Sequence, residues 1–191
     1  MDYKTLVQCL MDTLAQAKMA YMFVGGLAVN YWGIPRTTID VDIVIALQPE
    51  AVLRLVRPLK QLRFDVQADD VALIARVGNS FMTHSPLTPH RVDFWIPRTD
   101  FERRAFERRR QERLHGKTAW LISPEDLVVM KLLAGREKDL NDAAGVLQRQ
   151  RSRLNESYMA PWVKRLALTR SMTQVRRMLQ GEVSHGTRRK S

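Results

Sequence analysis

Two aspartates separated by one residue lie in an apolar run of the sequence. Asp40 and Asp42 belong to IDVDIVIAL, residues 39–47, which is rich in β-branched residues and predicts a strand. Successive strand residues point to opposite faces, so both carboxylates share one face. Such a pair repels itself and is costly to bury, and a divalent cation relieves both penalties. The pattern favours Mg²⁺, which prefers oxygen ligands.

A third carboxylate, Asp93, stands in the run RVDFWI, residues 91–96, which predicts another strand. Neighbouring strands lie about 4.8 Å apart, so adjacency of the two strands would bring Asp93 into the same cluster. Two metals held there would activate an attacking oxygen and stabilise a leaving group. Asp40, Asp42 and Asp93 are therefore the predicted metal ligands and catalytic residues. A solvated Asp-x-Asp pair and a structural Asp93 are the alternatives.

Gly25 and Gly26 end a short apolar run, Tyr21 to Val24, that predicts a strand entering a tight turn. Glycine lets the backbone approach a phosphate closely, and the N-terminus of a following helix adds attraction for an anion. The spacing from Gly26 to Asp40 leaves room for a short helix and a return loop. A Gly-Gly pair by itself is usually only a turn.

Together these residues resemble a known family. The run FVGGLAVNYWGIPRTTIDVDIVI resembles the signature of the nucleotidyltransferase superfamily whose fold is shared with DNA polymerase beta, where a third Asp follows on a later strand. Residues 33–42, Gly-x-Pro-Arg-x-Thr-x-Asp-x-Asp, resemble its AbiEii-like branch in particular. The resemblance implies a Mg²⁺-dependent enzyme with a two-metal site that moves a nucleoside monophosphate from an NTP, with Gly25 and Gly26 holding the triphosphate.

A second block, SPEDLVVMKLLAGREKDLNDAAGVL, resembles a later motif of that branch. The resemblance implies that Lys131 contacts the nucleotide phosphates. Asp139 and Asp142 share a helix face at their spacing and would orient Lys131 or support the metal site. The alternative is a surface set of ion pairs with Arg136 and Lys138, and a solvated Lys131.

Arg36 and Thr38 precede the acidic pair on the same strand parity and are assigned to nucleotide binding. The planar guanidinium of Arg36 suits phosphate, whereas Thr38 also simply favours a strand. His84 and His90 lack a metal-ligand spacing to another His or Cys and are interpreted as structural or surface residues. The lone Cys9 is interpreted as a small core residue.

The chain is strongly basic, with 31 Lys and Arg against 20 Asp and Glu and a formal charge of +11. Such an excess favours a polyanionic partner. The segment Phe101 to Lys117 is rich in arginine and predicts a helix over 99–113, and its surplus charge makes it the candidate RNA-facing stripe. The basic end of the chain is a second candidate.

The predicted fold is α+β: a mixed sheet flanked by helices, followed by a small helical region. The expected divisions are a nucleotidyltransferase domain over 1–150, helices over 151–181 and a disordered basic tail over 182–191. Further expectations are a hairpin of 71–76 with 79–83, a helix over 49–62 that Pro58 ends or kinks, and a helix that Ser123 caps and Gly135 ends.

The branch resemblance implies the toxin half of a toxin–antitoxin or abortive-infection pair, with a cognate antitoxin as partner. The acceptor would be the 3′ end of a tRNA or a protein hydroxyl, and the charge favours RNA. The alternatives are nucleotidylation of a small molecule such as an antibiotic, an antitoxin-type enzyme, and a non-catalytic nucleic-acid-binding module. Without a secretory signal or a membrane-length apolar run, the expectation is a cytoplasmic protein with no membrane partner.

Overall fold

Six strands form one mixed sheet, and all of them lie in the first of two units into which the chain divides. The computed structural model describes residues 1–186. Unit 1 comprises Met1–Leu27 and Thr37–Ile122, and unit 2 comprises Ala28–Arg36 and the chain from Ser123 onward. The predicted domain boundary at residue 150 stays a prediction.

The sheet has the order β3-β4-β2-β1-β6-β5. Its strands are β1 (Tyr21–Phe23), β2 (Val41–Ile45), β3 (Ser80–Thr83), β4 (Val92–Trp95), β5 (Arg110–Leu114) and β6 (Lys117–Leu121). The pair β2 and β4 and the pair β1 and β6 are parallel, while β1–β2, β3–β4 and β5–β6 are antiparallel. This confirms the predicted α+β class with a mixed sheet.

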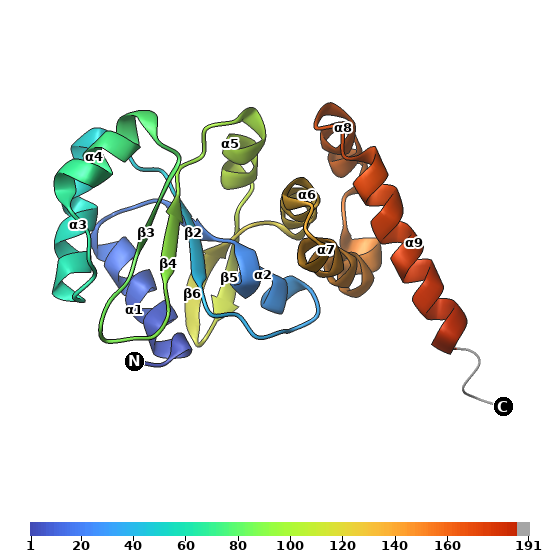
Figure 1. Ribbon diagram of the computed structural model, residues 1–191, viewed down its shortest axis with the longest axis horizontal. Coiled ribbons are helices and arrows are strands. Elements are labelled where there is room, and N and C mark those ends of the chain that lie inside the picture. The colour runs from blue at the N-terminus through green and yellow to red at the C-terminus, as the bar shows by residue number, and fades with distance from the viewer. Residues whose placement is uncertain (187–191) are drawn as a thin grey trace. The chain divides into compact units, whose positions relative to one another are not determined.

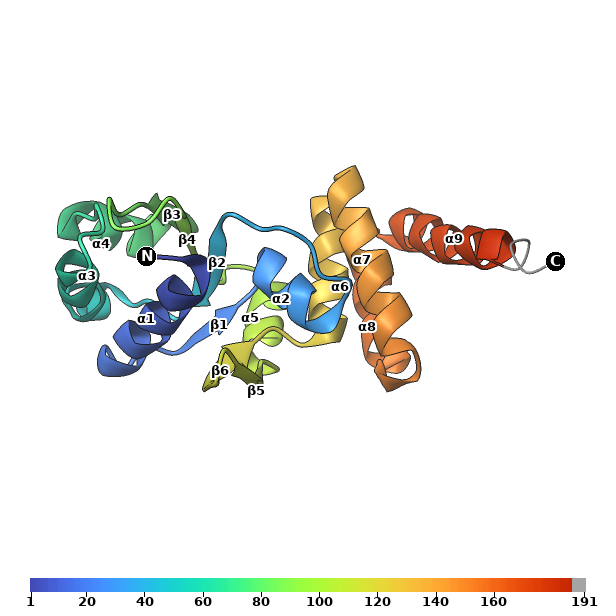
Figure 2. The ribbon, with the colours of Figure 1, turned by 90° about the horizontal axis from the view of Figure 1, so that it is seen from below.

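Helices cover both sides of this sheet within unit 1. They are α1 (Tyr3–Gln16), α3 (Val52–Gln61), which follows a 3₁₀ turn at Pro49–Ala51, α4 (Ala68–Val77) and α5 (Asp100–Glu107). In both views α1, α3 and α4 lie on one side of the sheet and α5 on the other (Figures 1 and 2). Leu6, Leu10 and Leu14 of α1 are fully buried, as their helical spacing predicts.

The predicted hairpin of 71–76 with 79–83 is wrong, because the first segment is the helix α4 and β3 pairs with β4. Val71 and Ala75 are both buried one helical turn apart, and Asp69 and Asp70 stand in the first turn, where the helix dipole favours them. A short apolar run fits either period, so the sequence pattern was ambiguous.

The predicted helix over 99–113 is also wrong in its second half. Thr99 begins α5 with a capping box, but α5 ends at Glu107. The chain then forms β5, which returns through His115 and Gly116 to pair with β6. Pairing with β6 is a tertiary contact that the local arginine-rich pattern does not reveal.

Pro58 does not end α3, which continues through it to Gln61. A proline inside a helix costs a hydrogen bond and strains the preceding turn. The helix persists because Leu55, Val56 and Leu59 are buried around it.

Unit 2 is helical. The helix α2 (Gly25–Trp32) begins in unit 1 and ends in unit 2, which also holds α6 (Pro124–Ala134), α7 (Glu137–Gln150), a 3₁₀ turn at Arg151–Arg153, α8 (Glu156–Arg165) and α9 (Thr169–Gly186). Ser123 caps α6 by accepting a hydrogen bond from the Asp126 N–H, and Gly135 ends it in the left-handed conformation. Both ends were predicted.

The helix α9 continues past Gly181 to Gly186, into the range predicted as a tail. Glycine inside a helix costs only about 1 kcal/mol relative to alanine, so it need not stop one. The rest of the predicted tail, 187–191, lies outside the described residues. None of the helices within residues 1–186 combines the length and the apolar character needed to cross a membrane.

Candidate active site

The Gly-Gly turn joins β1 to the first turn of α2. Gly25 has a positive φ of 58°, and a Cβ built on it would lie 1.9 Å from Oδ2 of Asp42. A Cβ on Gly26 would lie 2.3 Å from Oγ1 of Thr38. Only glycine therefore lets the Asp42 carboxylate and the Thr38 hydroxyl lie against the start of this helix.

The strands β2 and β4 bring two of the predicted metal ligands together. They are adjacent and parallel, and Asp42 stands directly opposite Asp93 in the register. The strand predicted over 39–47 is shorter, Val41–Ile45, so Asp40 lies just before β2 and its backbone is irregular. The flanking Val41 and Ile43 are fully buried, so packing of the apolar residues fixes the strand that carries the acidic ones.

An arginine that the sequence interpretation did not single out joins this cluster. Nη2 of Arg91 lies 2.8 Å from Oδ2 of Asp40 and 3.1 Å from Oδ2 of Asp93. A single nitrogen of the Arg91 guanidinium thus pairs with the carboxylates of both Asp40 and Asp93. Arg91 precedes Asp93 by two residues on the same strand parity, and this is the signal that would have revealed it.

Asp93 is the most shielded member of the contact, with a side chain 16% exposed. Burial raises its pKa and the Asp40 charge adds to that, while the Arg91 guanidinium lowers it; the net direction is upward. Among the described residues, Oδ1 of Asp93 is buried and has no hydrogen-bond partner. A buried carboxylate oxygen with no donor is a site where a cation would bind favourably.

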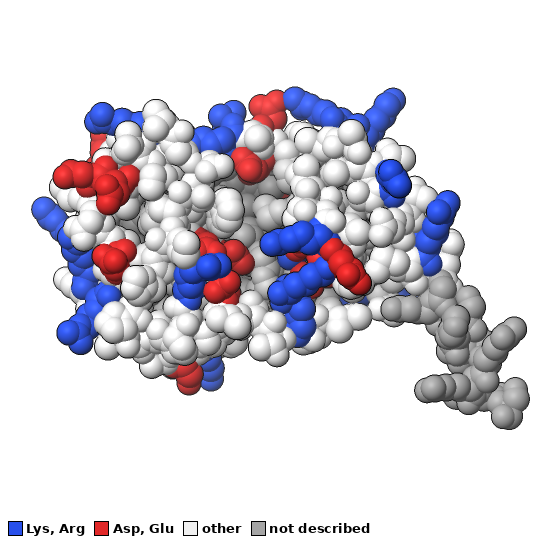
Figure 3. Space-filling view, in the orientation of Figure 1, with Lys and Arg blue, Asp and Glu red and all other residues white. Residues whose placement is uncertain are grey.

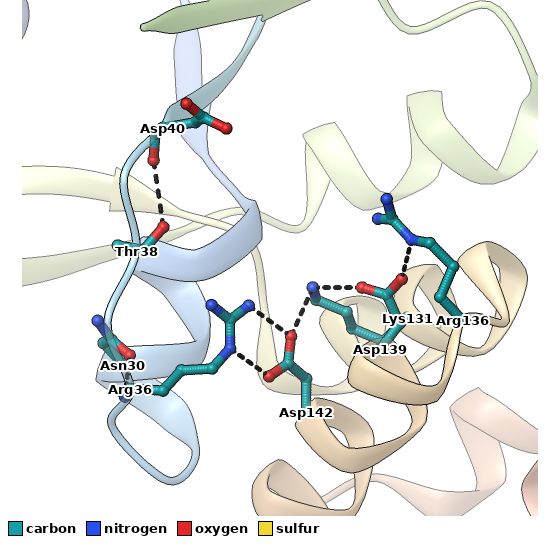
Figure 4. Close-up of polar contacts among 8 residues, drawn as sticks. All are labelled: Asn30, Arg36, Thr38, Asp40, Lys131, Arg136, Asp139 and Asp142. Carbon is teal, nitrogen blue, oxygen red and sulfur yellow. Dashed lines mark hydrogen bonds and ion pairs between the residues drawn. The ribbon is translucent and has the colours of Figure 1, made fainter. Parts of the chain in front are cut away.

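The backbone leading to Asp40 is held from two sides. The Thr38 hydroxyl donates to the Asp40 carbonyl at 3.3 Å, as Figure 4 shows, and the Tyr3 hydroxyl reaches the same oxygen at 3.4 Å. Nδ1 of His90 lies 2.9 Å from the Ile39 carbonyl, and its ring packs edge-on against Tyr3. His90 therefore has a structural role here, and Thr38 contacts the acidic loop.

Among the side chains that the structure describes, those of residues 1–180, no group of three or more His, Cys, Asp or Glu is arranged to hold a metal ion as it stands. The Arg91 guanidinium bridges two of the three predicted ligands. The metal-binding role of Asp40, Asp42 and Asp93 stays a prediction.

Unit 2 carries a separate buried network of charges, built on α6 and α7 (Figure 4). Nζ of Lys131 lies 2.8 Å from both Asp139 and Asp142. Arg36 makes a bidentate pair with Asp142 at 2.6 and 2.8 Å, and Arg136 binds Asp139 at 2.6 Å. The two aspartates are only 2% and 5% exposed, which excludes the alternative of a solvated surface set.

These carboxylates are charged and paired. Burial would raise the pKa of both aspartates, but hydrogen bonds from cations outweigh burial and lower it. Lys131 and Arg136 donate these bonds to Asp139. Arg36 and Lys131 donate them to Asp142. Asp139 and Asp142 thus orient Lys131, as predicted from their spacing. Contact of Lys131 or Arg36 with a phosphate stays a prediction.

The arginine-rich segment 101–117 does not form a single basic stripe. Arg103 and Arg104 of α5 face acidic partners one turn away. Arg109 lies over the rings of Phe106 and Trp120, at 4.4 and 4.7 Å from their centroids, and burial lowers its pKa. Part of this charge is therefore neutralised or used in packing.

The Gly-Gly turn at a helix N-terminus and the aspartates on two adjacent parallel strands belong to a mixed sheet with the nucleotidyltransferase fold. The chain matches the family described as "Nucleotidyltransferase of unknown function (DUF6036)" over residues 4–155 and belongs to it. The match includes every predicted site residue. A comparison with curated proteins finds no match.

Solved structures show the same fold. The antibiotic-resistance factor ANT(2'')-Ia in solution is 12% identical, with a TM-score of 0.56, and the similarity covers 95% of this chain and 97% of that one. The crystal structure of ANT(2'')-Ia in complex with adenylyl-2''-tobramycin is 13% identical, with a TM-score of 0.58, covering 85% and 97%. At this identity the likeness establishes the fold alone.

Proposed function

We propose that this chain is a Mg²⁺-dependent enzyme of the cytoplasm that transfers a nucleoside monophosphate from an NTP to a hydroxyl group of an RNA. The observation that carries the proposal is the unpaired, buried Oδ1 of Asp93. Asp93 stands opposite Asp42, and the Asp42 carboxylate lies against the glycine turn. Hard carboxylate oxygens suit Mg²⁺, so the residues present fit this metal.

In the reaction, an acceptor hydroxyl oxygen attacks the α-phosphorus, and the bond from that phosphorus to the bridging oxygen breaks. Pyrophosphate leaves, and a phosphodiester forms. Asp40, Asp42 and Asp93 would hold the metal, which supplies charge stabilisation for the attacking and leaving oxygens when bound. Asp93 would also help to take the proton of the acceptor hydroxyl as the new bond to phosphorus forms.

The triphosphate would be held by the backbone N–H groups of Gly25 and Gly26 at the start of α2, where the helix dipole favours an anion. Lys131 would contact the phosphates, as the resemblance implies. Within unit 2, two carboxylates hold its ammonium group, which keeps a further N–H donor. Arg36 belongs to the same set through Asp142.

The acceptor is assigned to RNA because the net charge of +11 favours a polyanion. A tRNA 3′ end and the toxin half of a toxin–antitoxin pair are the specific forms that the AbiEii-like resemblance implies, with a protein hydroxyl as the other acceptor. A small-molecule acceptor is the second candidate. It is favoured by the similarity, over nearly the full length of both chains, to ANT(2'')-Ia, whose crystal complex contains an adenylylated tobramycin.

Label transfer tests the reaction and the acceptor together. The protein is incubated with each α-³²P-labelled NTP and Mg²⁺, and separately with total RNA, total protein or tobramycin. An Asp40→Asn/Asp42→Asn variant, which removes two charges at nearly constant volume, is the control. Label moving to RNA in the native protein only is the expected result. Label on tobramycin would select the second candidate, and Mg²⁺–NTP binding without transfer to any acceptor would reject the enzyme.

A growth assay tests the toxin role separately. Expression of the native chain in a bacterial host should slow growth, and the Asp40→Asn/Asp42→Asn variant should not. Equal growth of both strains, at equal protein levels, would contradict the toxin assignment while leaving the transfer reaction intact.

A further inference from the structure

A basic surface of unit 1 lies on α3 and the turn that follows it. Between Val52 and Phe64 the chain has four cations, Arg54, Arg57, Lys60 and Arg63, and no acidic residue. Figure 3 shows Lys and Arg side chains along the edge of the molecule where α3 lies, at the left of the view. This surface differs from the arginines of α5, each of which has a carboxylate one turn away.

A groove of about 580 Å³ runs between the C-terminal end of α1 and α3. Lys18, Arg54 and Arg57 line it, and none of the described residues that line it is acidic. Asp12, the one carboxylate within α1, is already paired with Lys117. Three cations beside one groove repel one another, and phosphate groups would relieve that repulsion.

The other lining residues suit a nucleic-acid strand. Gln16 and Gln61 offer amide donors to phosphate or base edges. Leu53 is 51% exposed and gives the groove an apolar surface against which a base or ribose can pack. A cationic wall with an apolar contact and neutral donors is the combination that single-stranded nucleic acid uses.

We propose that this α1–α3 groove binds the phosphate backbone of the RNA acceptor at a distance from the reacting carboxylates. Tyr3, at the start of α1, contacts the Asp40 carbonyl, whereas the groove lies at the far end of the same helix. The 14 residues of α1 span about 20 Å, so substitutions in the groove leave the acidic cluster untouched. The inference rests on the proposed RNA acceptor and not on the transfer step.

The test is binding of a fluorescein-labelled 20-nucleotide single-stranded RNA, measured by anisotropy over a range of salt concentrations without NTP or Mg²⁺. Two double variants are compared: Arg54→Gln/Arg57→Gln in the groove and Arg103→Gln/Arg104→Gln on α5. Both remove two positive charges from exposed helix positions of unit 1, so a diffuse effect of net charge weakens both equally.

Each phosphate contact that the groove variant loses should make the slope of log K against log salt concentration less steep by about 0.7. The loss of two contacts should lower the affinity for RNA about 25-fold at 0.1 M salt. The α5 variant should change affinity less than about threefold, since salt screens charges beyond about 10 Å. Arg54→Lys/Arg57→Lys keeps both charges and should restore most of the binding. Unchanged melting temperatures would show that all variants fold.

Equal weakening by the two glutamine variants, or none by the groove variant, would overturn the inference. Equally tight binding of a poly-glutamate peptide in the groove would overturn RNA as its occupant. Failure of this inference can be distinguished from failure of the proposed function, because RNA binding is measured without the transfer reaction. Native RNA binding with no label transfer would reject the enzyme and keep the groove.

Discussion

Replacing Arg91 with glutamine tests the acidic cluster most directly. The change removes the guanidinium that lies 2.8 Å from Asp40 and 3.1 Å from Asp93. Arg91 and Asp40 are 44% and 37% exposed, so their pair contributes little, and only Asp93, at 16%, is well shielded. The metal-free protein should therefore lose about 1–2 kcal/mol in free energy of unfolding.

The same substitution should have the opposite effect on metal binding. A cation between the carboxylates is repelled by the guanidinium, and a divalent ion about 5 Å from a unit charge in water is disfavoured by about 1.5 kcal/mol. Removing Arg91 should therefore tighten Mn²⁺ binding roughly tenfold. Saturating metal should then restore the stability lost in the variant, because it replaces the missing positive charge.

Free Mn²⁺ can be titrated by its electron paramagnetic resonance signal without nucleotide. Urea unfolding in EDTA and in saturating Mg²⁺ gives the two free energies of unfolding. Arg103→Gln, at a 59% exposed position on α5, is the matched control and should leave both measurements unchanged. Mn²⁺ binding no tighter than native, or an equal loss of stability with and without metal, would refute the argument and leave Arg91 a purely structural ion pair.

Three further outcomes are expected. Gly25→Ala should abolish Mn²⁺ binding and should lower the free energy of unfolding more than Gly116→Ala does. Both glycines have a positive φ, but only a Cβ on residue 25 would lie against the Asp42 carboxylate. Mn²⁺ titration and urea unfolding measure the two effects. Lys131→Met should destabilise unit 2 by about 3 kcal/mol, measured in urea, because it removes a cation shared by two buried carboxylates, and a loss below 1 kcal/mol would contradict the network. The pKa of Asp139 and of Asp142 is lowered in the folded protein, so both stabilise it at pH values above the ordinary Asp range. This stabilisation is lost as the pH falls through the lowered pKa values. Free energies of unfolding measured from pH 7 down to about pH 3 should show the loss, and the decrease should be less steep in Lys131→Met.

Local sequence determined much of the site. Glycines that end an apolar run, and an aspartate pair at strand parity, have conformational meanings that do not depend on the rest of the chain. Ser123, Pro124 and Gly135 likewise fixed the ends of α6, since caps act within one helical turn. The spacing of Asp139 and Asp142 placed them on one face of α7, and the structure shows both against Lys131.

Other features depended on contacts between distant segments. The adjacency of β2 and β4, which sets Asp42 opposite Asp93, is decided by sheet order, and nothing local in either strand specifies its neighbour. The segment 99–113 contains a strand that its arginine-rich pattern does not predict, because β5 exists through its pairing with β6. Arg91 gained its meaning only when Asp40 came within reach of its guanidinium.

The division follows from the range of the forces involved. Sequence by itself determined the residue types and the local geometry of the glycine turn, the acidic strand and the capped helix, because dihedral preferences and hydrogen bonds within one turn act over a few residues. Only the tertiary structure decided which charges meet: the bridge of Arg91 to Asp40 and Asp93, and the burial of the Lys131 network. Ion pairing and desolvation depend on distance in space, and the chain sets that distance only by folding.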